Sequence, residues 1–147
     1  MIFQDNLTVF YTDDDHEDIE FFKEVTSALP NRPDVVAHSS GSKLLDALHN
    51  PPPHPHIIFL DLNMPGINGF EVLKRVRAND SLSNLPVVIF TTSSDDRTIE
   101  KSRDLGANFF LPKSSSYPEL KKSIEHALNI DWTSFNPNRE QFVYAHN

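Results

Sequence analysis

The sequence predicts an α/β protein in which five strands alternate with five helices around a parallel sheet. Five short apolar segments are each followed by a polar turn and then by residues with helical periodicity. The strand segments are apolar throughout instead of alternating, which is typical of a parallel sheet covered on both faces. The alternation of strands with helices along the chain favours a doubly wound, three-layer arrangement.

The composition is typical of one compact, acidic domain. The chain has 147 residues, of which 38% are hydrophobic, enough for a single core. Its formal net charge of -8 argues against nucleic acid and anionic membranes as direct partners. Cysteine is absent, which excludes disulfides and thiolate metal sites. No apolar run is long enough for a membrane span, and MIFQDNLTVF lacks the features of a signal peptide. We therefore expect a cytoplasmic protein of bacterial type.

The first half of the chain contains three predicted strands. Residues 7–11 are short and apolar, and the helix expected over 16–29 has one apolar face. Prolines at 30 and 33 end that helix, and residues 34–38 form the second strand. Gly41 opens a short helix with leucines at 44, 45 and 48. Residues 50–56 (NPPPHPH) are too proline-rich for either element, so the third strand covers 56–60.

The second half continues the same alternation. Phe70, Leu73 and Val76 mark the third helix, a loop covers 81–86, and residues 87–90 (VVIF) form the fourth strand. A polar helix follows and ends at Gly106. Its few apolar positions include Ile99 and Leu105.

The fifth strand is expected over 108–111, and Ser116 with Glu119 fits a capping box for the last helix. That helix turns Leu120, Ile124, Ala127 and Leu128 inward. The tail, residues 130–147, has aromatic residues but no clear period, so we expect little regular structure there. Its aromatic residues are equally consistent with an interface and with packing on the domain itself.

Polar side chains follow the predicted strands where the strands end. Asp13 and Asp14 follow the first strand, Asp61 the third, Thr91 the fourth and Lys113 the fifth. Sites in open parallel sheets form beyond the carboxyl ends of the strands. Each residue alone is more simply a cap, a turn former or a surface charge, and we interpret Asp15 as a helix cap. Together they predict a site.

The combination of these side chains points to phosphate chemistry. Carboxylates at close range repel one another and favour a divalent cation. Ligation by oxygen alone selects Mg²⁺ or a similar hard ion. A lysine and a hydroxyl supply charge and a hydrogen bond to a phosphoryl group. Asp61 then has the surroundings of an aspartyl nucleophile.

At this point the sequence resembles the receiver domain of two-component response regulators. The matching segments are VFYTDDD (9–15), IIFLDLNMPGINGFEVL (57–73), PVVIFTT (86–92) and LGANFFLPK (105–113). The resemblance implies a flavodoxin-like fold with strand order 2-1-3-4-5. It implies a receiver domain over residues 1–129 and a C-terminal tail over 130–147, with no separate output domain.

The resemblance also implies a Mg²⁺ site. Asp61 matches the phospho-accepting aspartate of the family. Asp14 matches the direct metal ligand, and Asp13 matches the acid that often acts through water. Asn63 matches the residue whose backbone carbonyl completes the metal site.

Three further positions match the switch of the family. Thr91 matches the switch hydroxyl, Phe110 the switch aromatic and Lys113 the lysine that pairs with phosphate. Ser114 stands where many relatives have a cis proline. Because a cis bond to a non-proline residue costs about 3 kcal/mol, we expect a trans bond or a differently shaped loop. Phe110 also lacks the phenol of the usual tyrosine.

The implied function is that of a stand-alone regulator and not of an enzyme. Asp61 would accept a phosphoryl group from a sensor histidine kinase or a histidine phosphotransfer protein. The face made by the fourth helix, fifth strand and fifth helix would then signal to an unknown downstream protein. A homodimer is compatible with a stand-alone regulator of this kind.

Three alternatives remain at the level of sequence. A Mg²⁺-dependent phosphohydrolase with an aspartyl nucleophile uses similar groups, but DLNMP lacks its second acid and no cap insertion is present. A Ca²⁺ loop at residues 13–20 lacks the required glycine, since Asp18 stands there. A scaffold that takes no phosphate is disfavoured by the intact acid set.

Overall fold

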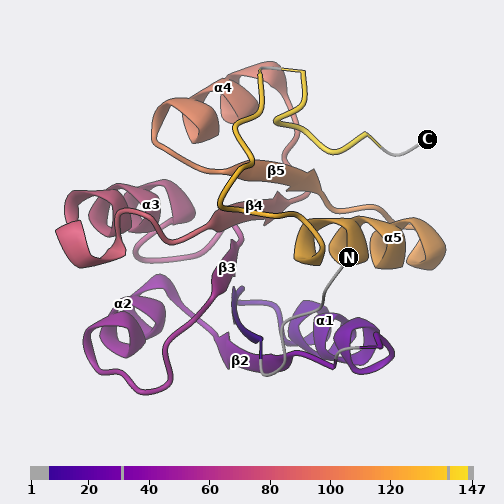
Figure 1. Cartoon of the computed structure of the whole chain (residues 1–147), viewed down its shortest axis with the longest axis horizontal. Helices are drawn as coiled ribbons and strands as arrows, with labels where there is room; N and C mark the ends of the chain where they lie inside the picture. The colour runs from indigo at the N-terminus through magenta and orange to yellow at the C-terminus, as the bar shows by residue number, and fades with distance from the viewer. Residues whose placement is uncertain (1–6, 31, 139, 146–147) are drawn as a thin grey trace.

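The computed structural model describes residues 7–30, 32–138 and 140–145. Its five parallel strands form one sheet of order β2-β1-β3-β4-β5, which confirms the predicted flavodoxin-like fold (Figure 1). The strands are β1 (Thr8–Thr12), β2 (Asp34–His38), β3 (Ile57–Leu60), β4 (Val87–Thr91) and β5 (Phe109–Pro112). The helices are α1 (His16–Ser27), α2 (Gly41–His49), α3 (Gly69–Ala78), α4 (Asp96–Asp104) and α5 (Tyr117–Leu128).

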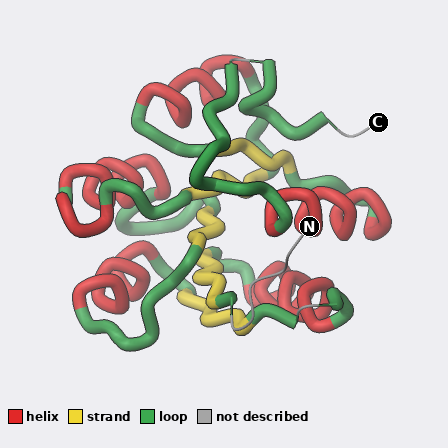
Figure 2. Tube along the Cα trace, viewed as in Figure 1, coloured by secondary structure: helices red, strands yellow, loops and turns green. Residues whose placement is uncertain are grey.

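The sheet is the middle of three layers (Figure 2). Helices α1 and α5 cover one face, and α2, α3 and α4 cover the other (Figure 1). Each face has its own apolar core, one built on Phe22 and Phe59 and the other on Leu44 and Leu73. Every residue of β3 is buried, as is every residue of β4, because both strands lie inside the sheet. This burial explains why the strand segments are apolar without alternation.

Short polar side chains cap the N-termini of the helices. Asp15 accepts hydrogen bonds from the amides of Glu17 and Asp18, which confirms it as the cap of α1. Ser116 caps α5 by accepting from the amide of Glu119. The Glu119 carboxylate does not return to the cap residue, however. It accepts a hydrogen bond of 2.7 Å from the Ser114 hydroxyl, so only half of the expected capping box forms.

Gly69 lets the start of α3 lie directly against the end of β3. A Cβ atom at this position would come within 2.5 Å of the Asp61 carbonyl oxygen and 2.8 Å of the Leu62 Cα. Both neighbours are backbone atoms, so no side-chain rotation would relieve the clash. Gly69 therefore allows α3 to begin in close contact with the backbone of Asp61 and Leu62.

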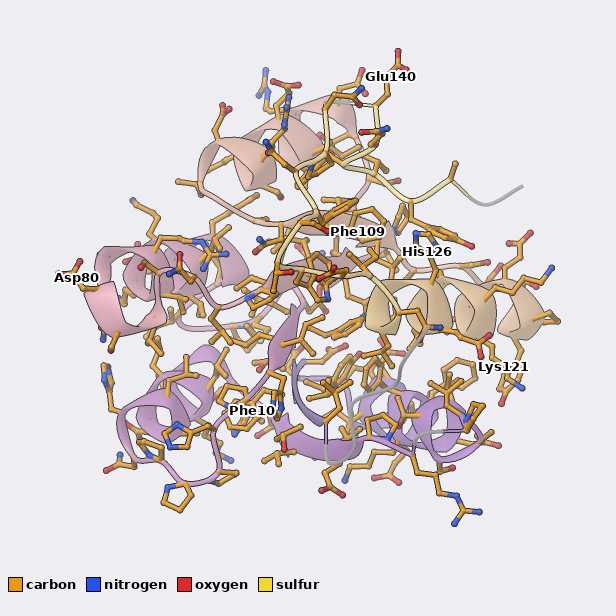
Figure 3. All side chains as sticks on the ribbon, viewed as in Figure 1. Phe10, Asp80, Phe109, Lys121, His126 and Glu140 are labelled. Carbon is orange, nitrogen blue, oxygen red and sulfur yellow. The ribbon has the colours of Figure 1, made fainter. Side chains whose placement is uncertain are left out.

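The described part of the tail packs on the domain. The Phe110 amide donates to the Phe142 carbonyl at 2.9 Å, and the Tyr144 amide donates to the Phe110 carbonyl at 2.9 Å. Val143 thus forms an isolated bridge beside β5, and the Phe142 side chain is buried. Trp132 and Phe135 pack on Phe109, which lies near His126 of α5 (Figure 3). Little regular structure forms, as expected, and these aromatic residues contact the chain's own domain.

Two details differ from the expectations or refine them. The loop expected over 81–86 begins within a short 3₁₀ turn, Asp80–Leu82. Among the described residues the cis peptide bonds are Pro51–Pro52 and Pro52–Pro53, so the Lys113–Ser114 bond is trans. No helix of the described chain is long and apolar enough to cross a membrane.

Candidate functional site

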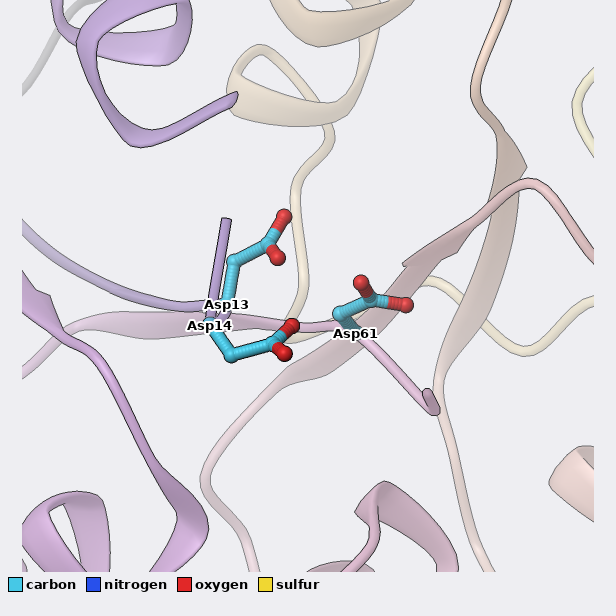
Figure 4. Close-up of side chains that lie close together, drawn as sticks. All are labelled: Asp13, Asp14 and Asp61. Carbon is cyan, nitrogen blue, oxygen red and sulfur yellow. The ribbon is translucent and has the colours of Figure 1, made fainter. Parts of the chain in front are cut away.

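Three carboxylates meet at the carboxyl edge of the sheet. Oxygen atoms of Asp13, Asp14 and Asp61 all lie within 4.8 Å of one another (Figure 4). The strand register explains the meeting, because Thr12 of β1 pairs with Leu60 of β3. Asp13 and Asp61 are the next residues of these two neighbouring strands. Their proximity follows from parallel pairing and needs no special loop.

Asp61 is a buried carboxylate with two nearby donors. The Asn63 amide donates to Oδ1 at 3.3 Å, and the Lys113 ammonium donates to Oδ2 at 3.3 Å. Burial raises the pKa of Asp61, while the positive charge of Lys113 opposes that rise. Both contacts are long, and the Thr91 hydroxyl is a further hydrogen-bonding group that lowers the pKa of Asp61.

Asp13 is held much more tightly than Asp61. Its side chain is fully buried, and Oδ2 accepts from the Tyr11 hydroxyl at 2.8 Å and from Lys113 at 2.7 Å. Oδ1 accepts from the Asp15 amide at 3.0 Å. Asp14, in contrast, is exposed at the mouth of the site. Burial, together with the charge of Asp13, raises the pKa of Tyr11 far above its usual range, so the phenol remains a donor.

The Lys113 ammonium stands opposite the acids and contacts three of them. Its distances are 2.7 Å to Asp13, 2.8 Å to Asp18 and 3.3 Å to Asp61. Burial alone would lower the pKa of Lys113, but the hydrogen bonds to Asp13 and Asp18 raise it above its usual range. The lysine therefore keeps its positive charge inside the site.

Asp18 was not among the site residues expected from the sequence. It lies in the first turn of α1, five residues after Asp13. The only signal available was its place in that turn, near the edge where the strands end. An acid in the first turn of a helix is ordinarily explained by the helix dipole. Its orientation toward Lys113 appears only once α1 has packed on the sheet.

Thr91 ends β4 beside the acids and is fully buried. Its hydroxyl oxygen accepts from the Asn63 side-chain amide at 3.3 Å and from the Ser93 amide at 3.4 Å. The Asn63 side chain also donates to the Ser93 hydroxyl at 3.0 Å. The segment after β3 is thus tied to the segment after β4. The role expected for the Asn63 backbone carbonyl stays a prediction.

Phe110 is buried on the face covered by α2, α3 and α4. It lies two residues before Pro112, which is the register partner of Thr91. Because side chains alternate along a strand, Phe110 and Pro112 share a face. The Phe142 ring packs near Phe110, with ring centroids 6.4 Å apart.

The sequence is similar to known response regulators. The profile of the response regulator receiver domain matches residues 9–125. The response regulator Rcp1 of Synechocystis sp. is 38% identical over 73 residues, which are 50% of this chain and 50% of that protein. The matched part of the chain spans about half the length of these curated relatives.

Two solved structures show the same fold over most of both chains. The phosphorylated cyanobacterial phytochrome response regulator RcpA is 27% identical with a TM-score of 0.77, covering 90% of this chain and 97% of that one. The Mn²⁺-bound form of Rcp1 is 25% identical with a TM-score of 0.77, covering 90% and 99%. Together with the family match and the acid–lysine site, they show that this chain belongs to the response regulator receiver domain family of two-component systems.

Proposed function

We propose that Asp61 accepts a phosphoryl group in a Mg²⁺-dependent step. The observation that carries the proposal is the convergence of three carboxylates within 4.8 Å, opposite the ammonium of Lys113. Receiver domains are signalling domains and are not generally classed as enzymes. They interact with histidine kinases or phosphotransfer proteins, and we propose one of these as the donor.

The acid cluster fits a hard divalent cation. All the candidate ligands are oxygens, and Asp14 and Asp61 offer the carboxylates least occupied by protein donors. Asp13 already accepts three hydrogen bonds, which suits a ligand acting through water. The Asn63 carbonyl is the fourth group of the proposed set. Bound Mg²⁺ would neutralise charge on the carboxylates and the incoming phosphoryl oxygens.

The proposed step is a displacement at phosphorus. One Asp61 oxygen forms a bond to phosphorus while the bond between phosphorus and the donor's imidazole nitrogen breaks. The electron pair of that bond stays on the nitrogen, so the donor leaves as histidine. Lys113 moves its hydrogen bond from Asp61 to a phosphoryl oxygen. The protein contributes by placing these groups and balancing charge.

The proposed switch starts at Thr91. Its hydroxyl acts on the Asp61 carboxylate by a hydrogen bond that lowers the pKa of that group, so it is placed to donate to a phosphoryl group there. The two hydrogen bonds that its oxygen accepts are long and resist its movement only weakly. Movement of Thr91 would free space on the side where Phe110 lies. Helix α4 is weakly anchored, because Ser102 is its one buried residue. We therefore propose that α4 shifts at low cost and that the face made by α4, β5 and α5 signals this change to a downstream protein.

The tail is proposed to belong to the receiver unit. Residues 142–144 pair with β5, and Phe142 is buried within the domain core. We propose residues 1–129 as the receiver domain and residues 130–147 as a C-terminal tail, of which residues 142–144 complete the receiver beside β5. A homodimer is tested by measuring the molecular size of the full chain over a range of concentrations, since a monomer at every concentration would count against it.

Intact-mass analysis tests the proposed function. The protein is incubated with acetyl phosphate and Mg²⁺, and we expect one added phosphoryl group, absent without Mg²⁺ and in Asp61→Asn. Asp80→Asn is the control, because Asp80 is exposed at the outer edge of the molecule (Figure 3). Equal labelling of Asp61→Asn would refute the assignment. Multiple turnover of small phosphate esters would instead support the phosphohydrolase alternative.

A further inference from the structure

We propose that Asp18 is a positioning residue that keeps the Lys113 ammonium at the site during phosphoryl transfer to Asp61. The inference rests on the proposed function and extends it to a carboxylate of α1. Asp18 Oδ2 lies 2.8 Å from Lys113 Nζ, a shorter contact than the 3.3 Å between Lys113 and Asp61. The closest partners of the lysine are thus Asp13 and Asp18.

The hydrogen-bond capacity of the ammonium explains why a third acid matters. Lysine has three N–H donors, and Asp13, Asp18 and Asp61 take one each. Two of these partners change during the proposed step. Asp61 acquires the phosphoryl group. Asp13, which already accepts from the Tyr11 hydroxyl, would also share its charge with the bound cation. Of the three acids, Asp18 is the one whose chemical state stays the same. The ammonium also lies over the Phe90 ring, 5.4 Å from its centroid.

Packing alone does not hold the ammonium. A cavity of about 220 Å³ borders Lys113, and its lining includes Asp18, Phe21 and Leu120. Side chains therefore do not fill the space beside Lys113 between α1 and the start of α5. Asp18 reaches across from α1 and contacts the ammonium at 2.8 Å, while the same ammonium lies 3.3 Å from Asp61.

The pair differs from an ordinary surface ion pair. Lys113 is only 10% exposed, while Asp18 is 41% exposed. In contrast, Lys23 and Glu20 of the same helix are 3.9 Å apart and both well exposed. Solvent screens the Asp18 contact on one side only, so the charge of Asp18 still acts on the lysine.

Phosphorylation kinetics test the inference. The rate of mass gain with acetyl phosphate and Mg²⁺ is compared among the wild type, Asp18→Asn, Asp18→Glu and Glu17→Gln. We expect Asp18→Asn to be about threefold to tenfold slower, because the hydrogen bond from the lysine loses the negative charge of its acceptor. Asp18→Glu should recover part of the rate. Glu17→Gln removes the same charge from an exposed neighbour and should leave the rate unchanged.

A double-mutant cycle separates positioning from a general effect of charge. If Asp18 acts through Lys113, then Asp18→Asn should slow phosphorylation only while Lys113 is present, and not in the Lys113→Ala background. A similar loss in both backgrounds, or a wild-type rate for Asp18→Asn, would overturn the inference.

Thermal melting in EDTA gives a readout that needs neither metal nor phosphate. Asp18→Asn should lower the melting temperature relative to Glu17→Gln, and this difference should vanish or reverse in the Lys113→Ala background. An equal shift in both backgrounds would contradict the pairing. If the wild type accepts no phosphoryl group, the proposed function fails, and the melting cycle still decides whether Asp18 holds Lys113.

Discussion

The backbone of Phe110 is hydrogen-bonded on both sides of Val143, to the Phe142 carbonyl and the Tyr144 amide. The proposed switch residue is therefore paired with the C-terminal tail as well as with β4. The Phe142 ring is buried in the same core as Phe110. We therefore expect movement of Phe110 in the proposed switch to be coupled to docking of the tail, and Phe142 is the first residue to test.

Replacing Phe142 with alanine should destabilise the domain although the residue lies in the tail. The side chain is 1% exposed, and truncating a buried phenylalanine costs about 3 to 5 kcal/mol. Urea unfolding followed by circular dichroism measures the change. Phe135→Ala is the matched control, because Phe135 is only half-buried and should lose clearly less. Equal effects of the two substitutions would show that the tail does not dock as described.

Thr91→Ala should uncouple phosphorylation from the conformational change. Trp132 is the single tryptophan of the chain and packs against Phe109 of β5, with ring centroids 6.4 Å apart. Its fluorescence is therefore expected to report movement of this strand. We expect Thr91→Ala to accept a phosphoryl group on Asp61 while losing more than about half of the fluorescence change, because a methyl group offers no hydrogen bond.

The matched variant is Thr91→Ser, which keeps the hydroxyl and should keep most of the fluorescence change. If Thr91→Ala shows the full fluorescence change at an equal level of phosphorylation, Thr91 is not part of the switch.

Arg77→Ala should be among the more destabilising changes outside the site. Its guanidinium donates to the Gly106 and Leu85 carbonyls and to Asn108 Oδ1, at 2.8, 2.9 and 2.6 Å. Burial lowers the pKa of Arg77 without removing its charge. Loss of this side chain removes the Arg77 donors from the half-buried Gly106 and Leu85 carbonyls, while Asn108 Oδ1 keeps its 2.8 Å hydrogen bond from the Val87 amide. We therefore expect a loss of about 2 to 4 kcal/mol in urea unfolding.

Arg75→Ala is the control for this loss. Arg75 is exposed and pairs with Glu71 one turn away, an interaction worth about 0.5 kcal/mol. A similarly small effect of both substitutions would show that the Arg77 hydrogen bonds do not hold α3 to the strand-end loops.

His38 should make the fold sensitive to mild acid. Burial lowers the pKa of His38, and its Nδ1 is buried without a hydrogen-bond partner in the described chain. The unfolded chain therefore binds the proton first, at about pH 6.5. Stability should be fully present above that pH and should fall as pH drops toward the lowered folded value, by up to about 1.4 kcal/mol per unit.

The His38 contribution is checked with urea unfolding between about pH 7.5 and 5.5. His38→Leu should flatten the pH dependence in this window. His54→Gln, in the exposed proline-rich loop, should keep the slope of the wild type. An unchanged slope in His38→Leu would mean that other groups control the acid response.

The acid pair was predictable from the sequence for a local reason. Apolar strand segments reveal their own ends, and parallel strands bring those ends to one edge, so Asp13 and Asp61 had to be close. The same argument placed Thr91 and Lys113. Asp18 was not predictable in this way, because its approach to Lys113 depends on how α1 is rotated on the sheet.

The tail illustrates the same limit. Its aromatic residues have no period that would indicate a buried face. Phe142 is buried because β5 is the last strand of the sheet and leaves backbone groups free at its outer side. That position results from strand order, which no local pattern in residues 130–147 contains.

By itself the sequence determined the five strand–helix units and the edge at which the charged residues gather, because hydrophobic period and strand ends are local properties. Only the tertiary structure decided which acids share the lysine and what covers β5. Those contacts join segments distant along the chain, and they depend on helix rotation and strand order.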